Sequence, residues 1–383
     1  MIYFDNAATT MIKPPQVIQA VVEALGSFGG VGRGVHPASL NAGRAVFDAR
    51  ASVARLLGAP SASCVSFALN ATMALNIALQ GLASSGSRIV TTSASHNSVL
   101  RPLFRLRDER NCQIKIAPIR RDGSLNYEEY EHLLVSFCPH IVVATHSSNL
   151  TGDVYDIARM ARVAHDNGAL FVLDAAQTAG SIPLSQEDLG VDVLCFTGHK
   201  SLFGPQGTGG LCVVPEVNIP PLLEGGSGTH TFEERHPCFM PEALEAGTVN
   251  AHGLAGLCAG IHFIEERGID SIHAHTRSLV QIFEEEVKLI EGLRVLGGHG
   301  GIDRCGIVAI DVDGVDAGRL GDCLAQEYGI CVRAGAHCAP LMHRSLGTED
   351  RGAVRFSFSY LNTEEEVEQG IRAVKECVAT LRC

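Results

Sequence analysis

The sequence contains no tryptophan, and aromatic side chains make up only 5% of its 383 residues. Proteins that bind single-stranded nucleic acids stack the bases on aromatic side chains, so this composition argues against such a surface. Positive charge is also scarce, because the formal net charge at pH 7 is −12. That balance argues against a nucleic-acid groove or an anionic membrane surface as the partner.

Long apolar runs and paired cysteines are missing as well. No stretch reaches the roughly 18 to 20 uninterrupted apolar residues of a membrane-spanning helix, and residues 1–5 show no signal-peptide pattern. The 13 cysteines include no Cys-x-x-Cys pair, which argues against a disulfide framework and a zinc site. We therefore expect a cytoplasmic protein without a metal, in which most cysteines, such as Cys195 and Cys212, are small buried apolar residues.

What the chain has in quantity is apolar side chains, at 46%, against 19% charged ones. In the first two thirds, short β-branched or apolar runs alternate with stretches of helical periodicity. This alternation predicts an α/β fold with a mainly parallel sheet covered by helices on both faces. The predicted strands are residues 87–92, 140–145, 169–174 and 191–197, and the predicted helices include 69–82 and 154–167.

From about residue 255 the pattern changes to that of an α+β unit. The closing helix begins after Thr363, which forms a capping box with Glu366. We place a large domain at residues 14–253, and a smaller one formed by residues 1–13 and 254–383. The predicted elements of the smaller domain are a helix at 254–267 that continues towards 290, strands at 306–312, 330–333 and 353–358, and a helix at 316–328.

An acid and a lysine follow two predicted strands of the large domain. Asp174 ends one strand, and Lys200 comes just after the next. Carboxyl ends of parallel strands meet at the ligand-binding edge of a sheet. A lysine there can bond to the aldehyde of pyridoxal phosphate, while an acid keeps the pyridine nitrogen protonated. Either residue alone is an ordinary loop cap, but the pair together favours the cofactor.

A phosphate and a stacked ring need further partners. Ala71 and Thr72 open a predicted helix whose backbone N–H groups can hold an anion, and Thr197 and His199 can add donors from the neighbouring strand end. His96 follows another predicted strand, where an imidazole can stack on the cofactor and move protons near neutral pH. Taken singly, these residues are equally typical of a helix cap or a surface loop.

One cysteine is set apart by its surroundings. Cys338 lies in a glycine-containing loop together with Arg333 and His337, neighbours that can lower the pKa of a thiol. Arg355, inside an otherwise apolar strand, can clamp an α-carboxylate through two hydrogen bonds. The alternatives are a buried thiol without a role and a structural ion pair.

Five motifs occur in order along the chain. They are residues 3–10 (Tyr-Phe-Asp-Asn-Ala-Ala-Thr-Thr), 174–177 (Asp-Ala-Ala-Gln), 197–200 (Thr-Gly-His-Lys), 245–250 (Glu-Ala-Gly-Thr-Val-Asn) and 333–338 (Arg-Ala-Gly-Ala-His-Cys). Together they resemble the class V aminotransferase fold, and most closely its cysteine desulfurase and selenocysteine lyase group. The Arg-x-Gly-x-His-Cys form of the last motif resembles the second group of desulfurases, which pass sulfur to a dedicated acceptor protein.

The resemblance implies a fold-type-I transferase that binds pyridoxal phosphate, with a seven-stranded, mainly parallel sheet in the large domain. It also implies a homodimer in which Thr248 of one subunit reaches the cofactor phosphate of the other. Asn149 is then expected to contact the cofactor and the substrate carboxylate, and Gln177 the ring hydroxyl. We further expect Arg333 and His36 near the substrate.

The function that these residues predict is a cysteine desulfurase that leaves alanine and a persulfide on Cys338, with Lys200 and His96 as the other catalytic residues. Selenocysteine in place of cysteine stays open. Two alternatives also stay open: another reaction on the same scaffold (transamination, epimerisation or β-elimination), in which Cys338 is a spectator, and a cofactor-binding protein without activity.

Overall fold

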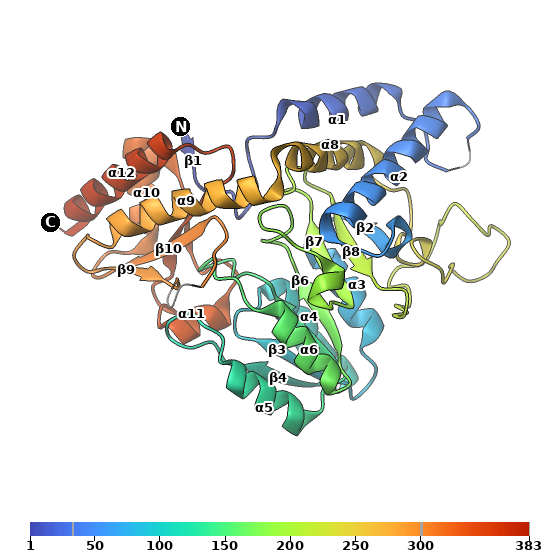
Figure 1. The fold of residues 1–383 in the computed structure, drawn as a ribbon, viewed down its shortest axis with the longest axis horizontal. Coiled ribbons are helices and arrows are strands. Elements are labelled where there is room, and N and C mark those ends of the chain that lie inside the picture. Colours follow the sequence, from blue (N-terminus) through green and yellow to red (C-terminus); the bar gives the residue numbers. More distant parts are fainter. Residues whose placement is uncertain (33, 299–301, 383) are drawn as a thin grey trace.

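The computed structural model describes residues 1–32, 34–298 and 302–382, and its largest element is a seven-stranded sheet surrounded by helices (Figure 1). Strand β8 is antiparallel to both of its neighbours, β7 and β2, whereas the other neighbouring pairs are parallel. In spatial order the strands are β2 (Val65–Ala68), β8 (Gly209–Val213), β7 (Val193–Thr197), β6 (Leu170–Asp174), β5 (Ile141–Thr145), β3 (Arg88–Thr92) and β4 (Gln113–Ala117). The predicted α/β class is confirmed.

The central strands are apolar on both faces because both faces are covered. In β6, Phe171 and Leu173 belong to one hydrophobic cluster and Val172 to another. Successive side chains of a strand point to opposite faces, so these two clusters lie on the two sides of the sheet. The helices of this part of the chain are α1 (Pro15–Ser27), α2 (Pro37–Leu57), α3 (Ala71–Leu82), α4 (Asn97–Arg110), α5 (Tyr127–Phe137), α6 (Ile157–Asp166), α7 (Gln186–Leu189) and α8 (Ala251–Arg267).

A second, antiparallel sheet forms the other end of the molecule, where both chain termini lie (Figure 1). Phe356 packs there between Phe4 and Phe283, with ring centroids 6.5 and 4.5 Å away. The four strands are β12 (Arg333–Gly335), β13 (Ala353–Ser357), β10 (Ile307–Val312) and β9 (Leu293–Leu296), and β1 (Ile2–Tyr3) pairs with β11 (Ile330–Cys331). The helices are α9 (Ile269–Val287), α10 (Ala317–Tyr328), α11 (Pro340–Leu346) and α12 (Glu364–Arg382). The domain boundaries stay predictions.

Several predicted elements match the structure, and some do not. The four predicted strands of the large sheet are β3, β5, β6 and β7, and the capping box is present, because Thr363 Oγ1 accepts from the Glu366 N–H at 3.2 Å. The long helix predicted from 254 towards 290 is wrong. Gly268, with φ of +81°, ends α8 and begins α9 at an angle that residues with a Cβ rarely adopt.

Two further differences concern the smaller sheet. The strand predicted at 330–333 is divided between β11 and β12, which belong to different sheets. Although no disulfide framework was expected, Cys323 of α10 and Cys377 of α12 form one disulfide bond. That bond ties two helices that already pack on each other.

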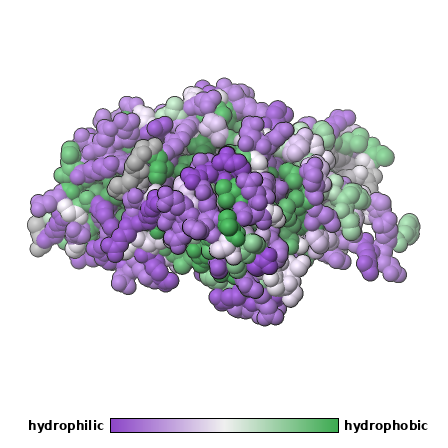
Figure 2. Space-filling model, turned by 60° about the horizontal axis from the view of Figure 1, so that its bottom comes forward, coloured by the Kyte–Doolittle hydropathy of each residue, from purple (hydrophilic) through white to green (hydrophobic). Residues whose placement is uncertain are grey.

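The surface is mostly hydrophilic on the face shown in Figure 2, where hydrophobic residues appear in separate groups between hydrophilic ones. Within the described residues, no helix is both long and apolar enough to span a membrane. Large apolar side chains that are exposed nevertheless occur in the N-terminal helices and beside the large sheet.

A buried ion pair ties α2 to the edge of the large sheet. Arg50 of α2 donates to both carboxylate oxygens of Glu245, at 2.6 and 2.9 Å. Glu245 also accepts from the backbone N–H of Phe67 in β2, at 2.6 Å. The carboxylate thereby fixes the start of the segment that carries Thr248. Sequence patterns did not assign this structural role to Glu245.

We predict that Glu245→Gln lowers the free energy of unfolding by about 3 kcal/mol, because it leaves the buried Arg50 charge without its partner. Urea unfolding followed by circular dichroism measures this change. Glu349→Gln is the matched control, since it removes the same charge from an exposed pair with Arg344. Equal losses in the two variants would contradict the role assigned to Glu245.

Candidate active site

The carboxyl ends of β5, β6 and β7 meet at one edge of the large sheet and open into a cavity of about 220 Å³. The pairing register places Thr145, at the end of β5, opposite Asp174, at the end of β6. All the residues predicted to bind the cofactor line this cavity except Thr248. The lining residues are Asn70, Ala71, Thr72, His96, Ser98, Thr145, Ser147, Asn149, Asp174, Ala176, Gln177, Thr197, His199 and Lys200.

Asp174 and Lys200 form the charged centre of the cavity. Burial lowers the pKa of Lys200 to about 8, and the negative charge of Asp174 acts in the opposite direction. Burial likewise raises the pKa of Asp174, while the Ala176 N–H, which donates to its Oδ1 at 3.0 Å, and the Lys200 charge lower it. A lysine with a lowered pKa is uncharged in part near neutral pH, and an uncharged amine is a nucleophile.

His96 stands at the start of α4 with a fixed orientation. Its Nδ1 accepts from the Ser98 N–H at 3.0 Å, so the ring proton is assigned to Nε2. Burial, followed by the nearby charge of Lys200, lowers the pKa of His96 to about 4. The imidazole is therefore neutral at pH 7, with a proton to donate from Nε2.

The opposite end of the cavity suits an anion. Asn70 caps α3 by accepting from the Met73 N–H at 3.0 Å, and Ala71 and Thr72 present the first turn of that helix to the cavity. Burial and the charges of Lys200 and Lys13 lower the pKa of His199 to about 4. A neutral His199 and the helix end can both donate hydrogen bonds to a phosphate.

Unpaired polar atoms in the cavity indicate a polar ligand. Thr145 Oγ1, Asn149 Oδ1 and Thr197 Oγ1 are buried and have no hydrogen-bond partner within the described part of the chain. A buried polar group without a partner is costly, so a ligand with several acceptors and donors accounts for these three atoms. The donor set, together with Asp174 and Lys200, fits pyridoxal phosphate. Sequence patterns missed Thr145 and Ser147, although each lies at or just after the end of a predicted strand.

Cys338 lies in a loop that is tied to the cavity by its backbone. The carbonyl of Cys338 accepts from the Asn97 N–H at 2.9 Å, next to His96, and the carbonyl of His337 accepts from Asn149 Nδ2 at 2.7 Å. Both His337 and Cys338 have positive φ, of 50° and 55°, a conformation that such residues adopt only when the surroundings impose it. The loop therefore presents the exposed Cys338 beside the cavity.

Arg355 of β13 lies on the other side of Asn149. Its Nη1 donates to the Asn149 carbonyl at 2.9 Å, and its Nη2 to Asp5 Oδ1 at the same distance. Arg333 of β12 is directly opposite Arg355 in the strand register, with an exposed side chain. The structure thus brings Arg355 and Cys338 to Asn149 from the smaller sheet.

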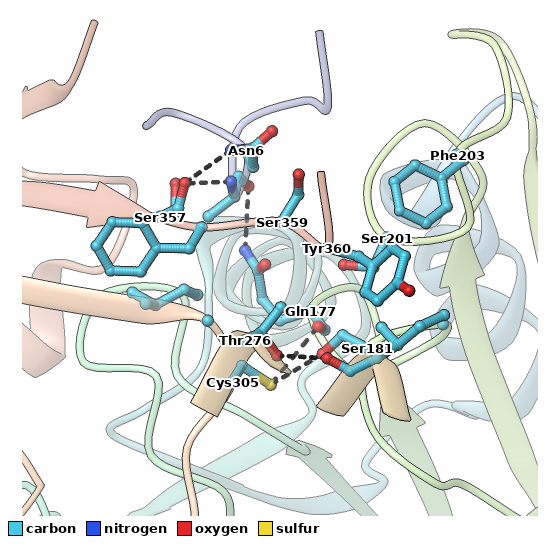
Figure 3. Close-up of a pocket in the computed structure, with 16 residues that line it drawn as sticks. Asn6, Gln177, Ser181, Ser201, Phe203, Thr276, Cys305, Ser357, Ser359 and Tyr360 are labelled. Carbon is cyan, nitrogen blue, oxygen red and sulfur yellow. Dashed lines mark hydrogen bonds between the residues drawn. The ribbon is translucent and has the colours of Figure 1, made fainter. Parts of the chain in front are cut away.

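Two predicted residues lie apart from the Lys200 cavity of their own chain. His36 caps α2, where its Nδ1 accepts from the Ser39 N–H at 3.4 Å, and Thr248 lines a separate cavity beside β2. Another small cavity, of about 30 Å³, lies between Gln177, Ser357 and the N-terminal segment (Figure 3). It contains none of the charged residues of the site.

Known proteins with similar sequences and structures agree with this geometry. The family model of aminotransferase class-V matches residues 2–369. Proteins named "Probable cysteine desulfurase" from Methanothermobacter thermautotrophicus and Pyrococcus abyssi are 33% and 34% identical, over 96% and 100% of this chain and 92% and 95% of theirs. The apo structure of a cysteine desulfurase from Thermococcus onnurineus NA1 has a TM-score of 0.92 and 33% identity, covering 99% of this chain and 95% of that one. The cysteine desulfurase CsdA of Escherichia coli has a TM-score of 0.88 and 28% identity, with coverage of 99% and 94%.

We predict that Lys200 reacts with an acylating reagent with a pH midpoint near 8 in ligand-free protein. Asp174→Asn is expected to move this midpoint to lower pH, because the carboxylate charge stabilises the ammonium form. Competitive labelling over a pH series, read by mass spectrometry, measures both midpoints, with Asp313→Asn as a surface control. A midpoint that rises or stays the same in Asp174→Asn would contradict the stabilisation of the Lys200 ammonium form by the Asp174 carboxylate.

Proposed function

The chain belongs to the aminotransferase class-V family and to its cysteine desulfurases, and on that premise we propose that it takes sulfur from L-cysteine with the help of pyridoxal phosphate. L-Alanine and a persulfide on Cys338 are the products of this step. The observation that carries the proposal is the double anchoring of the Cys338 loop, at Asn97 beside His96 and at Asn149. A spectator cysteine needs no such anchoring to residues that line the Lys200 cavity or adjoin them.

Each residue of the cavity would hold a different part of the cofactor. Asp174 would face the pyridine nitrogen, Gln177 would contact the ring hydroxyl, and His96 would lie against the ring face. The start of α3, Thr197 and His199 would hold the phosphate. Pyridoxal phosphate, when bound, supplies an aldehyde that bonds to the substrate amine and a ring that takes up electrons from the α-carbon.

Substrate positioning falls to Arg355 and Asn149, with Arg333 nearby. Arg355 retains a buried Nε without a partner in the described chain, a donor suited to the α-carboxylate. Lys200, with its pKa near 8, accepts the α-proton and returns it. His96 is neutral at pH 7, with its pKa lowered to about 4, and from Nε2 it donates a hydrogen bond to the substrate sulfur.

Cys338 then carries out the transfer. Its thiolate attacks the substrate sulfur, so that a sulfur–sulfur bond forms and the substrate Cβ–S bond breaks. The electron pair of the broken bond stays with the carbon skeleton, which takes up a proton and leaves as alanine. The sulfur stays on the exposed Cys338, where an acceptor protein can collect it. The same steps apply to selenium.

A homodimer completes the site. Thr248 lines a cavity of about 240 Å³, outside the Lys200 cavity of its own chain. Apolar side chains border it, including Leu69, 61% exposed and adjacent to Asn70 of the site, and Leu223, 52% exposed. Exposed apolar groups of this kind are typical of interfaces. A second copy that covers them brings its own Thr248 towards the phosphate end of the neighbouring cavity.

Cys338→Ser is expected to lower alanine release from cysteine by at least about a hundredfold, because a hydroxyl is a far weaker nucleophile towards sulfur. Binding of pyridoxal phosphate, followed by its visible absorbance, is expected to stay unchanged. Cys138→Ser is the matched control, since Cys138 is equally exposed and lies outside the site. An unchanged rate of alanine release in Cys338→Ser would refute the nucleophile, and keto acid in place of alanine would favour another reaction.

Sedimentation is expected to give twice the 40.6 kDa of one chain. Leu69→Glu should weaken the dimer by at least about tenfold, because association then buries an unpaired carboxylate. Leu289→Glu, at a position 75% exposed at the end of α9, is the control. A monomeric parent protein, or an effect of equal size in both variants, would contradict the interface.

A further inference from the structure

Arg355 has a partner that the proposed function leaves without a role. Its side chain is almost fully buried, with 2% of the residue exposed. Its Nη2 donates to Asp5 Oδ1 at 2.9 Å, and the two form an ion pair. A buried arginine without a counter-ion is unfavourable, so Asp5 supplies the charge that Arg355 requires while no ligand is bound.

Asp5 is held firmly in place. It forms a β-bridge with Ser357, two residues beyond Arg355 on β13. The next two residues are fixed in the same way: Asn6 Nδ2 donates to the Ser357 carbonyl at 2.8 Å, and the Ala7 N–H to Ser357 Oγ at 2.9 Å. Figure 3 shows Asn6 and Ser357 side by side above Gln177, which donates to the Ala7 carbonyl at 3.2 Å. These contacts fix the backbone around Asp5, so its carboxylate stays next to Arg355.

The same N-terminal segment also contacts the backbone at Lys200. Thr10 Oγ1 donates to the Lys200 carbonyl, and Lys13 Nζ to the His199 carbonyl, each at 2.9 Å. Residues 5–13 thus connect the arginine of the smaller sheet to the lysine of the larger one. Asp5 is the acidic residue at the arginine end of this connection.

We propose that Asp5 is an internal counter-ion that competes with the substrate carboxylate for Arg355. Its charge thereby lowers the affinity of the site for ligands that carry a carboxylate. This inference rests on the proposed function, in which Arg355 binds the α-carboxylate. The charged or titratable groups that act on Arg355 include Asp5, Arg333 and Tyr3. Lys200, His96 and His337 also lie within its electrostatic reach.

The physical basis is that two carboxylates then share one guanidinium. The ligand gains a hydrogen bond from an unpaired donor such as Nε, but it also meets the negative charge of Asp5 a few ångströms away. Repulsion between like charges in a buried site lowers the affinity for every ligand that carries a carboxylate, and leaves ligands without one unaffected. The carboxylate-bearing product is consequently released more readily.

Asp5→Asn tests this inference, because it keeps the shape and the accepting oxygen and removes the charge. Calorimetry on the purified holoenzyme measures two ligands that differ only at one group, L-alanine and 2-amino-1-propanol, which has a hydroxymethyl group in place of the carboxylate. We expect the Kd of L-alanine to fall by about fivefold or more, and the Kd of 2-amino-1-propanol to change by less than about twofold. The KM for cysteine should fall together with the Kd of alanine.

Asp313→Asn serves as the control, since it removes an exposed carboxylate far along the smaller sheet from Arg355. Equal or weaker binding of alanine in Asp5→Asn overturns the proposal, and so does an equal change for both ligands. If Asp5→Asn does not fold, Asp5→Ser must give the same pattern, with tighter binding of L-alanine and little change for 2-amino-1-propanol. Failure of the proposed function appears separately, as a parent enzyme that binds alanine but releases none from cysteine.

Discussion

The rest of the active site depends on a lysine and an aspartate that neighbouring strands of the large sheet bring into one cavity. Lys200 and Asp174 each pay a desolvation cost, and each partly offsets the cost of the other. The spacing of the two residues along the chain does not by itself bring them together. The parallel register of β5, β6 and β7 brings their ends together, and the apolar layers on both faces of the sheet keep that register. Burial lowers the pKa of Lys200 to about 8, and this is what lets the lysine act as a nucleophile near neutral pH.

Around this centre, the smaller sheet contributes its residues through backbone contacts. Arg355 and His337, the residue before Cys338, both bond to Asn149, and Cys338 itself bonds to Asn97. The N-terminal segment adds Asp5 to the arginine and holds the carbonyl groups next to the lysine. Arg355, Lys200 and Cys338, to which we assign substrate carboxylate binding, the reactive amine and the acceptor thiol, are therefore positioned by parts of the chain that are far apart in sequence. These side chains keep their relative positions only if the two sheets are packed rigidly against each other.

Sequence patterns succeeded where the signal is local. Buried strands such as β5 and β6 are continuous apolar runs, and the closing helix begins with a capping box, so each could be recognised from a few neighbouring residues. They failed where the outcome depends on distant contacts. Gly268 interrupts a continuous helical periodicity, and the segment after Tyr328 is shared by two sheets because β1 and β13 both offer it an edge. The periodicity of apolar residues along the chain does not show which sheet edge is free to pair with a strand.

By itself, the sequence determined the α/β class, the family, and the chemical character of the site, because strand-end Asp174 and Lys200 and the Cys338 loop belong to short motifs. Only the tertiary structure decided which side chains share a cavity. It placed Thr145 beside the predicted residues, left Thr248 and His36 outside, and paired Arg355 with Asp5 across 350 positions of chain. The reason is that a hydrogen bond or a charge pair requires ångström distances, which are set by the packing of the two sheets and not by spacing along the chain.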